Sequence, residues 1–400
     1  MERKKILFVI NNFDIGGPQK SLLSLLYRMD LNLYEVSLLI LNGRGSLNEY
    51  LPEQVKIIEP NPLISYSLLP PKGFFKNTIK KMFSLDYSFA LHAIPSVIKG
   101  LINKDMTKEK QRFWIKMKHS LPRLDMEFDV AIGVSGGHSM MYITDCVDSK
   151  KKIGWIRSDY RVLNRDHDID KAYFKEMSEI ISVSKICRDI FINIFPEALT
   201  KVKVMYNVLP FNMYKNIPAD TSLIKNEPGV VKLLTICRLD PNKGLDLAIG
   251  ALEILLGKNR DIKWYVLGDG SYKKELERII QEKGLENHLL LLGFQINTAE
   301  FIKRADIIVH PSRFEGKSNV IDEAKFLLKP IVATNYETVN EQIENGETGL
   351  ISEMNSESLA ICVEKMINGK KLKEEIYIKL KKEQYDDTKS IRTFQDIIER

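Results

Sequence analysis

The stretch His310-Pro-Ser-Arg-Phe-Glu-Gly-Lys-Ser-Asn-Val-Ile-Asp-Glu323, which continues to Lys329-Pro-Ile-Val-Ala-Thr334, carries the clearest structural signal of this chain. Before it, Ala305-Asp-Ile-Ile-Val-His310 indicates a short buried strand. Ser318 or Asn319 can cap a helix that ends at Pro330, and the β-rich run after this proline indicates a second strand. A strand, a loop, a helix and a strand in this order predict a parallel pair with a right-handed crossover.

Two carboxylates of this stretch, Glu315 and Glu323, lie eight positions apart, one on the loop and one on the helix. Parallel sheets bind ligands at the carboxyl ends of their strands, where free N–H groups at a helix start attract phosphate. Glu323 would lie just beyond that phosphate, near a ribose diol, and Glu315 would reach the other end of the ligand. The layout predicts a site for a sugar nucleotide, although a capped surface helix explains the spacing when it is taken alone.

The pattern Glu315-x7-Glu323, with Ala324 and the later Lys329-Pro-Ile-Val, resembles the signature of retaining glycosyltransferases of the GT-B fold. The resemblance is to family 4, and most closely to its members that build bacterial capsular polysaccharides and exopolysaccharides. It implies two Rossmann-like α/β domains facing across a cleft, with the sugar nucleotide held mainly by the second. Glu315 would hold the donor sugar and Glu323 the ribose. The expected nucleotide-binding set also includes Gly316, Lys317, Ser318, Asn319 and Val320, with a solvent-facing Lys317 as the alternative.

Other matches extend along the chain. Leu233-Leu-Thr-Ile-Cys-Arg-Leu-Asp-Pro-Asn-Lys-Gly-Leu-Asp-Leu-Ala248 resembles the opening of the family's C-terminal domain, which implies that Arg238 and Lys243 clamp the pyrophosphate. Two fixed cations stabilise the charge of a departing diphosphate, but ordinary surface cations on a turn are the alternative. The resemblance also implies that loops near Gly268 and Phe294 cover the base, where plain turn chemistry is the alternative.

The first half begins with a buried strand, Ile6–Ile10, followed by a loop with Gly16 and Gly17. This is not the Gly-x-Gly-x-x-Gly pattern of nicotinamide enzymes. The resemblance implies that both glycines face the donor, and a tight turn is the alternative. His138, in Ser135-Gly-Gly-His-Ser-Met140, stands where the family contacts acceptor or donor sugar, so it is our catalytic candidate in this half; a structural histidine is the alternative. Arg157 stands where the family often has histidine.

Length and composition predict a two-domain soluble enzyme: 400 residues, 44% hydrophobic and 28% charged. We expect residues 1–208 as the N-terminal, acceptor-binding domain, 209–229 as a linker, 230–380 as the nucleotide-sugar domain, and 381–400 as a helix crossing back to the first domain. The four cysteines show no metal spacing, which favours free thiols in a reducing compartment. Uncharged runs are too short for a membrane span, so we expect a cytoplasmic protein.

The net charge of +6 is unevenly distributed. Residues 72–123 hold twelve Lys or Arg against three acids, interleaved with aromatic and aliphatic residues. Such a segment suits the surface of an anionic membrane, where it would bring the enzyme to a lipid-linked acceptor at the inner face of the plasma membrane. A solvated helical face is the alternative. No nucleic-acid recognition motif accompanies the charge, so we expect no nucleic-acid partner.

The implied reaction transfers a sugar from a nucleoside diphosphate to an acceptor hydroxyl with retention. Retaining glycosidases use a carboxylate nucleophile, whereas the resemblance implies front-side attack, with the leaving phosphate taking the acceptor's proton. UDP is the expected carrier and GDP-mannose the alternative. We expect neither cofactor nor metal: Asp166-His-Asp168 looks like a metal motif of the other glycosyltransferase fold but lies in a polar connecting segment. A sugar-nucleotide epimerase and a catalytically silent assembly scaffold remain the alternative functions.

Overall fold

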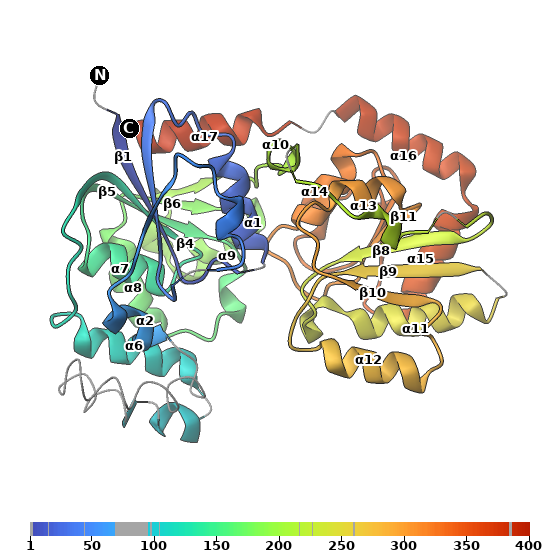
Figure 1. The fold of residues 1–400 in the computed structure, drawn as a ribbon, viewed down its shortest axis with the longest axis horizontal. Coiled ribbons are helices and arrows are strands. Elements are labelled where there is room, and N and C mark those ends of the chain that lie inside the picture. Colours follow the sequence, from blue (N-terminus) through green and yellow to red (C-terminus); the bar gives the residue numbers. More distant parts are fainter. Residues whose placement is uncertain are drawn as a thin grey trace. The chain divides into compact units, whose positions relative to one another are not determined.

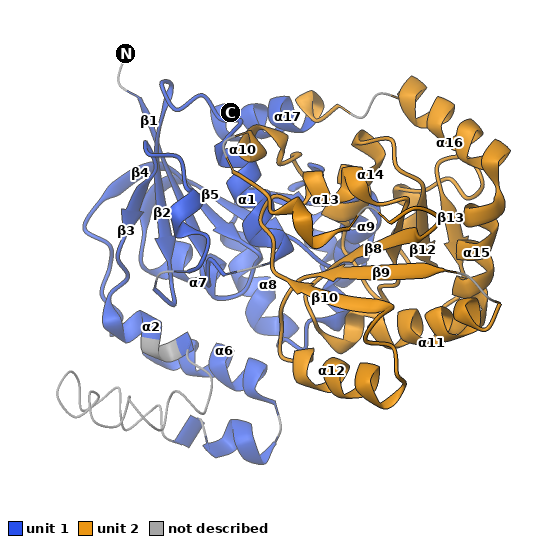
Figure 2. Cartoon of the chain, turned by 45° about the vertical axis from the view of Figure 1, so that its right-hand side comes forward, with its two compact units in different colours: residues 1–206, 390–400 blue, residues 207–389 orange. Residues whose placement is uncertain are grey.

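The computed structural model describes residues 3–14, 16–43, 45–68, 95–96, 98–103, 105–215, 217–225, 227–258, 261–383 and 386–400. The chain forms two compact units (Figure 2). Unit 1 comprises Met1–Tyr206 and Ser390–Arg400, and unit 2 comprises Asn207–Lys389. Each unit is built on its own sheet, and every strand pairing within the two sheets is parallel.

Unit 1 has a seven-stranded sheet in the order β3-β2-β1-β4-β5-β6-β7. The strands are β1 (Lys4–Ile10), β2 (Tyr34–Ile40), β3 (Lys56–Ile58), β4 (Glu127–Val134), β5 (Asp148–Ile156), β6 (Glu179–Ser182) and β7 (Val202–Val204). The central strand β1 is buried continuously from Ile6 to Ile10. A parallel sheet covered by helices on both faces requires such an unbroken apolar run.

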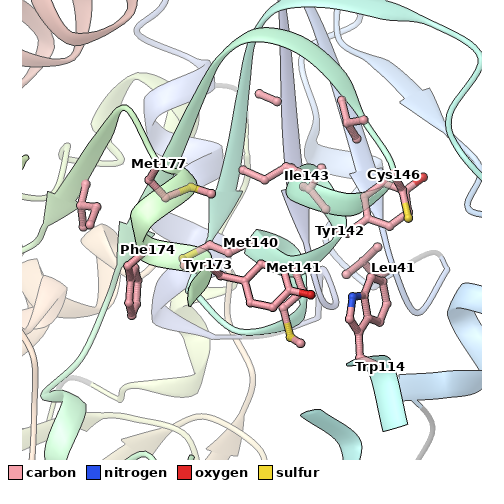
Figure 3. Packing of buried hydrophobic residues seen from close by; sticks show 14 of the residues in the cluster. Leu41, Trp114, Met140, Met141, Tyr142, Ile143, Cys146, Tyr173, Phe174 and Met177 are labelled. Carbon is pink, nitrogen blue, oxygen red and sulfur yellow. The ribbon is translucent and has the colours of Figure 1, made fainter. Parts of the chain in front are cut away.

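Helices cover both faces of this sheet (Figure 1). They are α1 (Gly17–Leu26), α2 (Pro62–Leu68), α6 (Met106–Met117), α7 (His138–Asp145), α8 (His167–Glu176), α9 (Lys185–Ile194) and α17 (Thr388–Glu399). Figure 3 shows the core around α7, where Met140 and Met141 lie near Tyr173 and Phe174 of α8. On α17, Phe394 stacks on Phe8 with ring centroids 6.1 Å apart. The end of the chain therefore packs on the first strand of unit 1.

Unit 2 has a six-stranded sheet in the order β10-β9-β8-β11-β12-β13. The strands are β8 (Val231–Ile236), β9 (Ile262–Leu267), β10 (Leu289–Gly293), β11 (Ile307–His310), β12 (Ile331–Thr334) and β13 (Leu350–Ser352). The strand order reverses between β8 and β11. In open α/β sheets this reversal marks the place, at the carboxyl ends of the strands, where ligands bind.

The helices of unit 2 form two groups. On one face of the sheet, a core cluster includes residues of α11 (Leu245–Leu256), α12 (Lys273–Glu282), α15 (Ser356–Asn368) and α16 (Lys370–Glu383). On the other face, α13 (Ala299–Arg304) and α14 (Asn319–Phe326) pack with the short helix α10 (Phe211–Tyr214) nearby (Figure 1). The predicted strand, loop, helix and strand are confirmed as β11, α14 and β12, with Ile308 paired to Ile331.

The segment 209–229, expected as a linker, belongs to unit 2 in the structure. Met213 and Tyr214 of α10 are buried, and Ile224 joins the core beneath α13 and α14. Of the basic segment 72–123, residues 72–94 lie outside the described residues. No helix in the described part of the chain is long and apolar enough to span a bilayer.

Candidate functional site

The loops after β8 and β11 meet at the carboxyl edge of the unit 2 sheet. After β8, the Asp240 side chain accepts a hydrogen bond from the Asn242 amide at 2.9 Å and caps a short 3-10 turn that presents Lys243. Gly244 follows in a left-handed conformation (φ 65°), and a Cβ there would lie 1.9 Å from the Pro311 carbonyl oxygen. Only glycine allows this approach, so backbone packing brings Lys243 beside the β11 loop.

A network of polar contacts surrounds Glu315 on that loop. Its Oε1 lies 2.8 Å from Lys243 Nζ and 3.0 Å from His310 Nε2, and it accepts a hydrogen bond from Ser312 Oγ at 3.0 Å. Burial alone would raise the pKa of Glu315, but the charge of Lys243 and the contacts with His310 outweigh it and lower the pKa to about 2. Glu315 is therefore a fixed anion and a weak base at neutral pH.

Arg238 stands at the same edge but is more open. Its side chain is 57% exposed, and its Nη2 lies 3.2 Å from Asp240 Oδ2. Such an exposed ion pair contributes little to stability, so the guanidinium can turn toward a diphosphate at small cost. The structure therefore brings Arg238, Lys243 and Glu315 together at the point where the strand order reverses.

Glu323 is fully buried in α14, behind the loop that carries Glu315. Its Oε2 accepts hydrogen bonds from Thr298 Oγ1 at 2.6 Å and from Tyr214 Oη at 3.3 Å. Burial and the charge of Glu323 hold the pKa of Tyr214 well above its ordinary value, so the tyrosine remains a donor. A ribose diol that binds Glu323 has to share or replace these hydroxyl contacts.

Lys317 and Ser318, which lie between the two glutamates, are held by buried contacts with Asp322 and Gln342. These four residues are called the clamp. The Lys317 side chain is only 5% exposed and its Nζ lies 2.8 Å from Asp322, which rules out the solvent-facing alternative for this lysine. Gln342 accepts from the Ser318 amide at 2.8 Å and donates to the Ser318 carbonyl and to Asp322, both at 2.8 Å. Ser318 also caps α14 by accepting from the Ile321 amide. The Ser318 amide, expected to face phosphate, thus already has an internal partner.

Gly268 and Phe294, the two residues expected near the nucleotide base, lie in different surroundings. Gly268 follows β9 with φ 145°, and a Cβ there would lie 1.8 Å from the Cys237 carbonyl oxygen, so packing against the β8 loop requires this glycine. Phe294 follows β10 directly and is partly buried. Gly316 lies on the loop directly after Glu315, and Asn319 and Val320 are the first two residues of α14.

In unit 1, the paired glycines open helix α1. Gly17 is its first residue, and a Cβ there would meet nothing within 4 Å, while Gly16 has an extended backbone with φ −178°. Neither needs a left-handed conformation, so the tight-turn alternative is not what selects glycine here. A Cβ on Gly16 would lie 2.4 Å from Oε1 of Gln19, the end of a flexible side chain. That both glycines face the donor stays a prediction.

His138 is the first residue of α7 and is 7% exposed. Its ring packs edge-on against Trp114 of α6, with centroids 5.7 Å apart, and its Nε2 lies 3.5 Å from the Lys110 carbonyl oxygen. Burial, and then the nearby charge of Arg165, lower the pKa of His138 to about 3. A neutral imidazole enclosed by core contacts is the setting of a structural histidine rather than of a catalytic base at neutral pH.

Asp166 and Asp168, the discounted metal motif, have a structural explanation. Asp166 caps α8 by accepting from the Ile169 amide, and Asp168 lies in the first turn of that helix, where acidic residues are favourable.

Comparison with known proteins shows what unit 2 is similar to. Residues 223–383 match the sequence model of the family described as Glycosyl transferases group 1. Most of unit 2 is therefore similar in sequence to the group 1 glycosyl transferases. The matched range includes Arg238, Lys243, Glu315, Glu323 and Gln342, whereas Tyr214 lies before it.

Individual proteins that are similar to this chain include other glycosyltransferases. Alpha-D-kanosaminyltransferase of Streptomyces kanamyceticus is 30% identical over 36% of this chain, but the alignment spans only 38% of that protein's length. The N-acetylgalactosamine-N,N'-diacetylbacillosaminyl-diphospho-undecaprenol 4-alpha-N-acetylgalactosaminyltransferase of Campylobacter jejuni is 23% identical over 89% of this chain and 87% of its own. The crystal structure of HepE from Anabaena in complex with UDP and glucose superposes with TM-score 0.71 at 17% identity, covering 99% of this chain and 100% of HepE. With its two parallel sheets, the chain has the GT-B fold, as predicted.

Several polar partners of Glu315 and Glu323 were not predicted from the sequence. His310 and Ser312 were quoted only as part of a strand end, although both contact Glu315. Gln342 belongs to no motif, and the partners of Glu323, Thr298 and Tyr214, lie far from it in sequence. The one available signal was at Ser312, because a hydroxyl three residues before a loop glutamate can bond to it locally.

Proposed function

We propose that this protein is a retaining glycosyltransferase that moves a sugar from a nucleoside diphosphate, with UDP as the expected carrier, to a glycan or lipid-linked acceptor in bacterial surface polysaccharide synthesis. The observation that carries the proposal is the contact of Lys243 with Glu315 at the carboxyl edge of the unit 2 sheet, within the range that is similar to the group 1 glycosyl transferases. The relative from C. jejuni, whose name specifies a diphospho-undecaprenol acceptor, and the HepE structure with UDP and glucose support donor and acceptor classes of this kind.

In the proposed reaction, the bond from the anomeric carbon to the diphosphate breaks while the acceptor oxygen bonds to the same face of the sugar. The acceptor's proton passes to the leaving phosphate. Arg238 and Lys243 stabilise the charge that develops on the diphosphate. Because one oxygen of Glu315 is tied to Lys243, His310 and Ser312, and because its pKa is about 2, this carboxylate is poorly suited to act as a nucleophile. Its proposed role is to orient the donor sugar.

The proposal includes attachment to an anionic membrane at the inner face of the plasma membrane. In the described part of the basic segment, Leu101 and Ile102 are 49% and 74% exposed, next to Lys99. Apolar side chains flanked by lysines favour a lipid surface. Co-sedimentation with phosphatidylglycerol vesicles should fall when Lys99 and its basic neighbours on α6 are changed to Gln. An equal number of lysines changed on α16 serves as the control, and equal losses from both variants would contradict the contact.

Nucleotide release tests the proposed activity. Purified protein is incubated with UDP-, GDP- and ADP-sugars, with and without bacterial membrane lipid extract. We expect release from one donor class, increased by the extract, and reduced in Glu323→Ala and Lys243→Ala but not in Glu277→Ala, an exposed change on α12. NMR of the product reports the anomeric configuration. An epimerised donor without transfer would identify the epimerase alternative, and turnover that survives both site variants would refute the site.

A further inference from the structure

A positively charged side chain, Arg157, stands at the carboxyl end of the unit 1 sheet and has no counter-charge among the residues that the structure describes. Arg157 is the first residue after β5 and is partly buried. Its Nε and Nη1 are shielded from solvent and have no hydrogen-bond partner in the described part of the chain. Burial lowers the pKa of Arg157 to about 9, and no carboxylate acts in the opposite direction. The guanidinium is nevertheless protonated at neutral pH.

Burying the Arg157 guanidinium without a partner lowers the stability of the folded protein. A buried cation without a partner loses several kcal/mol of hydration, and each buried N–H without an acceptor costs about 1–3 kcal/mol. A buried arginine ordinarily has a carboxylate partner, and Arg165 of unit 1 has one: its Nε and Nη2 lie 2.7 and 2.5 Å from the two oxygens of Asp170. Among the described residues, Arg165 thus has a carboxylate partner and Arg157 has none, which favours a ligand as the partner of Arg157.

The guanidinium of Arg157 is also held in place. Its Cζ lies 4.8 Å from the ring centroid of Trp155, and Trp155 is only 1% exposed. This cation–π contact holds the guanidinium over the face of a buried indole. A rigid fork of donors matches two oxygens of a phosphate or a carboxylate.

The neighbouring strands β4 and β1 are also followed by buried polar atoms that have no partner among the described residues. Ser135 is the first residue after β4, next to the register pair Val134 and Trp155, and it has a left-handed backbone with φ 71°. Its Oγ is buried without a partner among the described residues, and so is Oδ1 of Asn11, the first residue after β1. A serine in this conformation carries strain of about 1–3 kcal/mol, which is retained mainly at functional sites. Three adjacent strands thus end in unsatisfied polar groups at the ligand-binding edge of a parallel sheet.

We propose that Arg157, with Ser135 at the end of the adjacent strand β4, forms a subsite for an oxyanion, a phosphate or a carboxylate, of the substrate that unit 1 binds. The identity of that substrate as the acceptor rests on the proposed function, whereas the oxyanion site does not. The subsite selects acceptors that carry a negative charge near the reacting hydroxyl, since a neutral acceptor leaves the buried cation uncompensated.

Calorimetric titration of the full chain with sodium pyrophosphate, and separately with sodium succinate, tests the subsite. Both are done in a protein with Arg238→Ala and Lys243→Ala, so that neither cation of the unit 2 diphosphate site contributes. We expect binding that weakens at least about tenfold in Arg157→Gln, the loss of one charge-assisted contact, and less in Arg157→Lys. Arg123→Gln, an exposed change before β4, should leave binding unchanged. Tighter binding of pyrophosphate assigns a phosphate as the natural group, and tighter binding of succinate assigns a carboxylate.

Stability gives a second readout. In Tris-chloride buffer, which contains no oxyanion, Arg157→Gln should raise the melting temperature, because it removes a buried charge that has no partner. An arginine that only supports the fold would give a lower melting temperature. Binding of neither probe, unchanged binding in Arg157→Gln, or a lower melting temperature of that variant would each overturn the proposal. If no sugar nucleotide is turned over, the proposed function fails while the titration still reports on the subsite.

Discussion

Replacement of Lys243 by methionine should destabilise unit 2 by about 3 kcal/mol, because it leaves the buried Glu315 without its main counter-charge. The side chains of Lys243 and Glu315 are 19% and 16% exposed. The pKa of Glu315 falls from 4.5 to about 2, a difference of about 2.5 units, which corresponds to about 3.4 kcal/mol. His310 contributes part of this free energy. The loss of Lys243 alone should therefore cost about 3 kcal/mol rather than about 3.4 kcal/mol. As this folded-state pKa is depressed, the stabilisation is present at neutral pH and is lost as pH falls from about 4.5 toward 2.

Hydrogen exchange of the β8 amides, followed by mass spectrometry at pH 7, measures the opening of unit 2 separately from unit 1. About 3 kcal/mol corresponds to exchange roughly 150-fold faster in Lys243→Met. The Glu315→Gln change should recover most of this loss when it is combined with Lys243→Met. Lys258→Met breaks an exposed pair with Glu364 and should change exchange by less than about fivefold. Equal effects of the two lysine variants, or no coupling in the double variant, would refute the electrostatic reasoning.

Three further outcomes are expected. Between pH 8 and pH 5 the stability of unit 1 should fall by about 2 kcal/mol through His138, whose pKa drops from 6.5 to about 3 on folding, and His138→Gln should abolish that part of the urea-unfolding pH profile. Gly268→Ala should cost more than about 2 kcal/mol, since its Cβ would meet the Cys237 carbonyl, while Gly284→Ala, with nothing within 4 Å, should cost about 1 kcal/mol; equal melting temperatures would contradict this. Gln342→Leu should raise the donor KM about tenfold, because it removes the hydrogen bonds that hold the loop at Ser318. An unchanged KM would show that Gln342 does not position this loop for donor binding.

The sequence predicted those parts of the fold that local patterns encode. The element from β11 through α14 to β12 follows from an apolar run, a serine cap and a proline, all within 30 residues. Segment 209–229 looked like a linker because its prolines and polar residues hide the contacts of Tyr214 and Ile224, which form only when unit 2 is assembled. Tertiary packing, rather than local propensity, decides the state of such a segment.

The same distinction applies to the residues of the candidate site. Arg238, Lys243 and Glu315 lie on loops whose strands are adjacent, so strand order alone brings them to one edge. The burial of Lys317 depends on Asp322, whose orientation cannot be read from spacing. For His138, the glycine loop before it suggested an exposed position, but Trp114 of α6 covers the ring.

The role of Glu323 is the most direct test of the account, because the proposed donor site depends on a carboxylate that binds the ribose. Calorimetry compares the nucleoside diphosphate selected by the release assay with its 2′,3′-dideoxy analogue, in the wild-type protein and in Glu323→Gln. The account predicts that the wild type prefers the ribose form by about tenfold or more, and that the variant binds both forms equally. A preference that persists unchanged in Glu323→Gln would show that another group binds the ribose and would contradict the site.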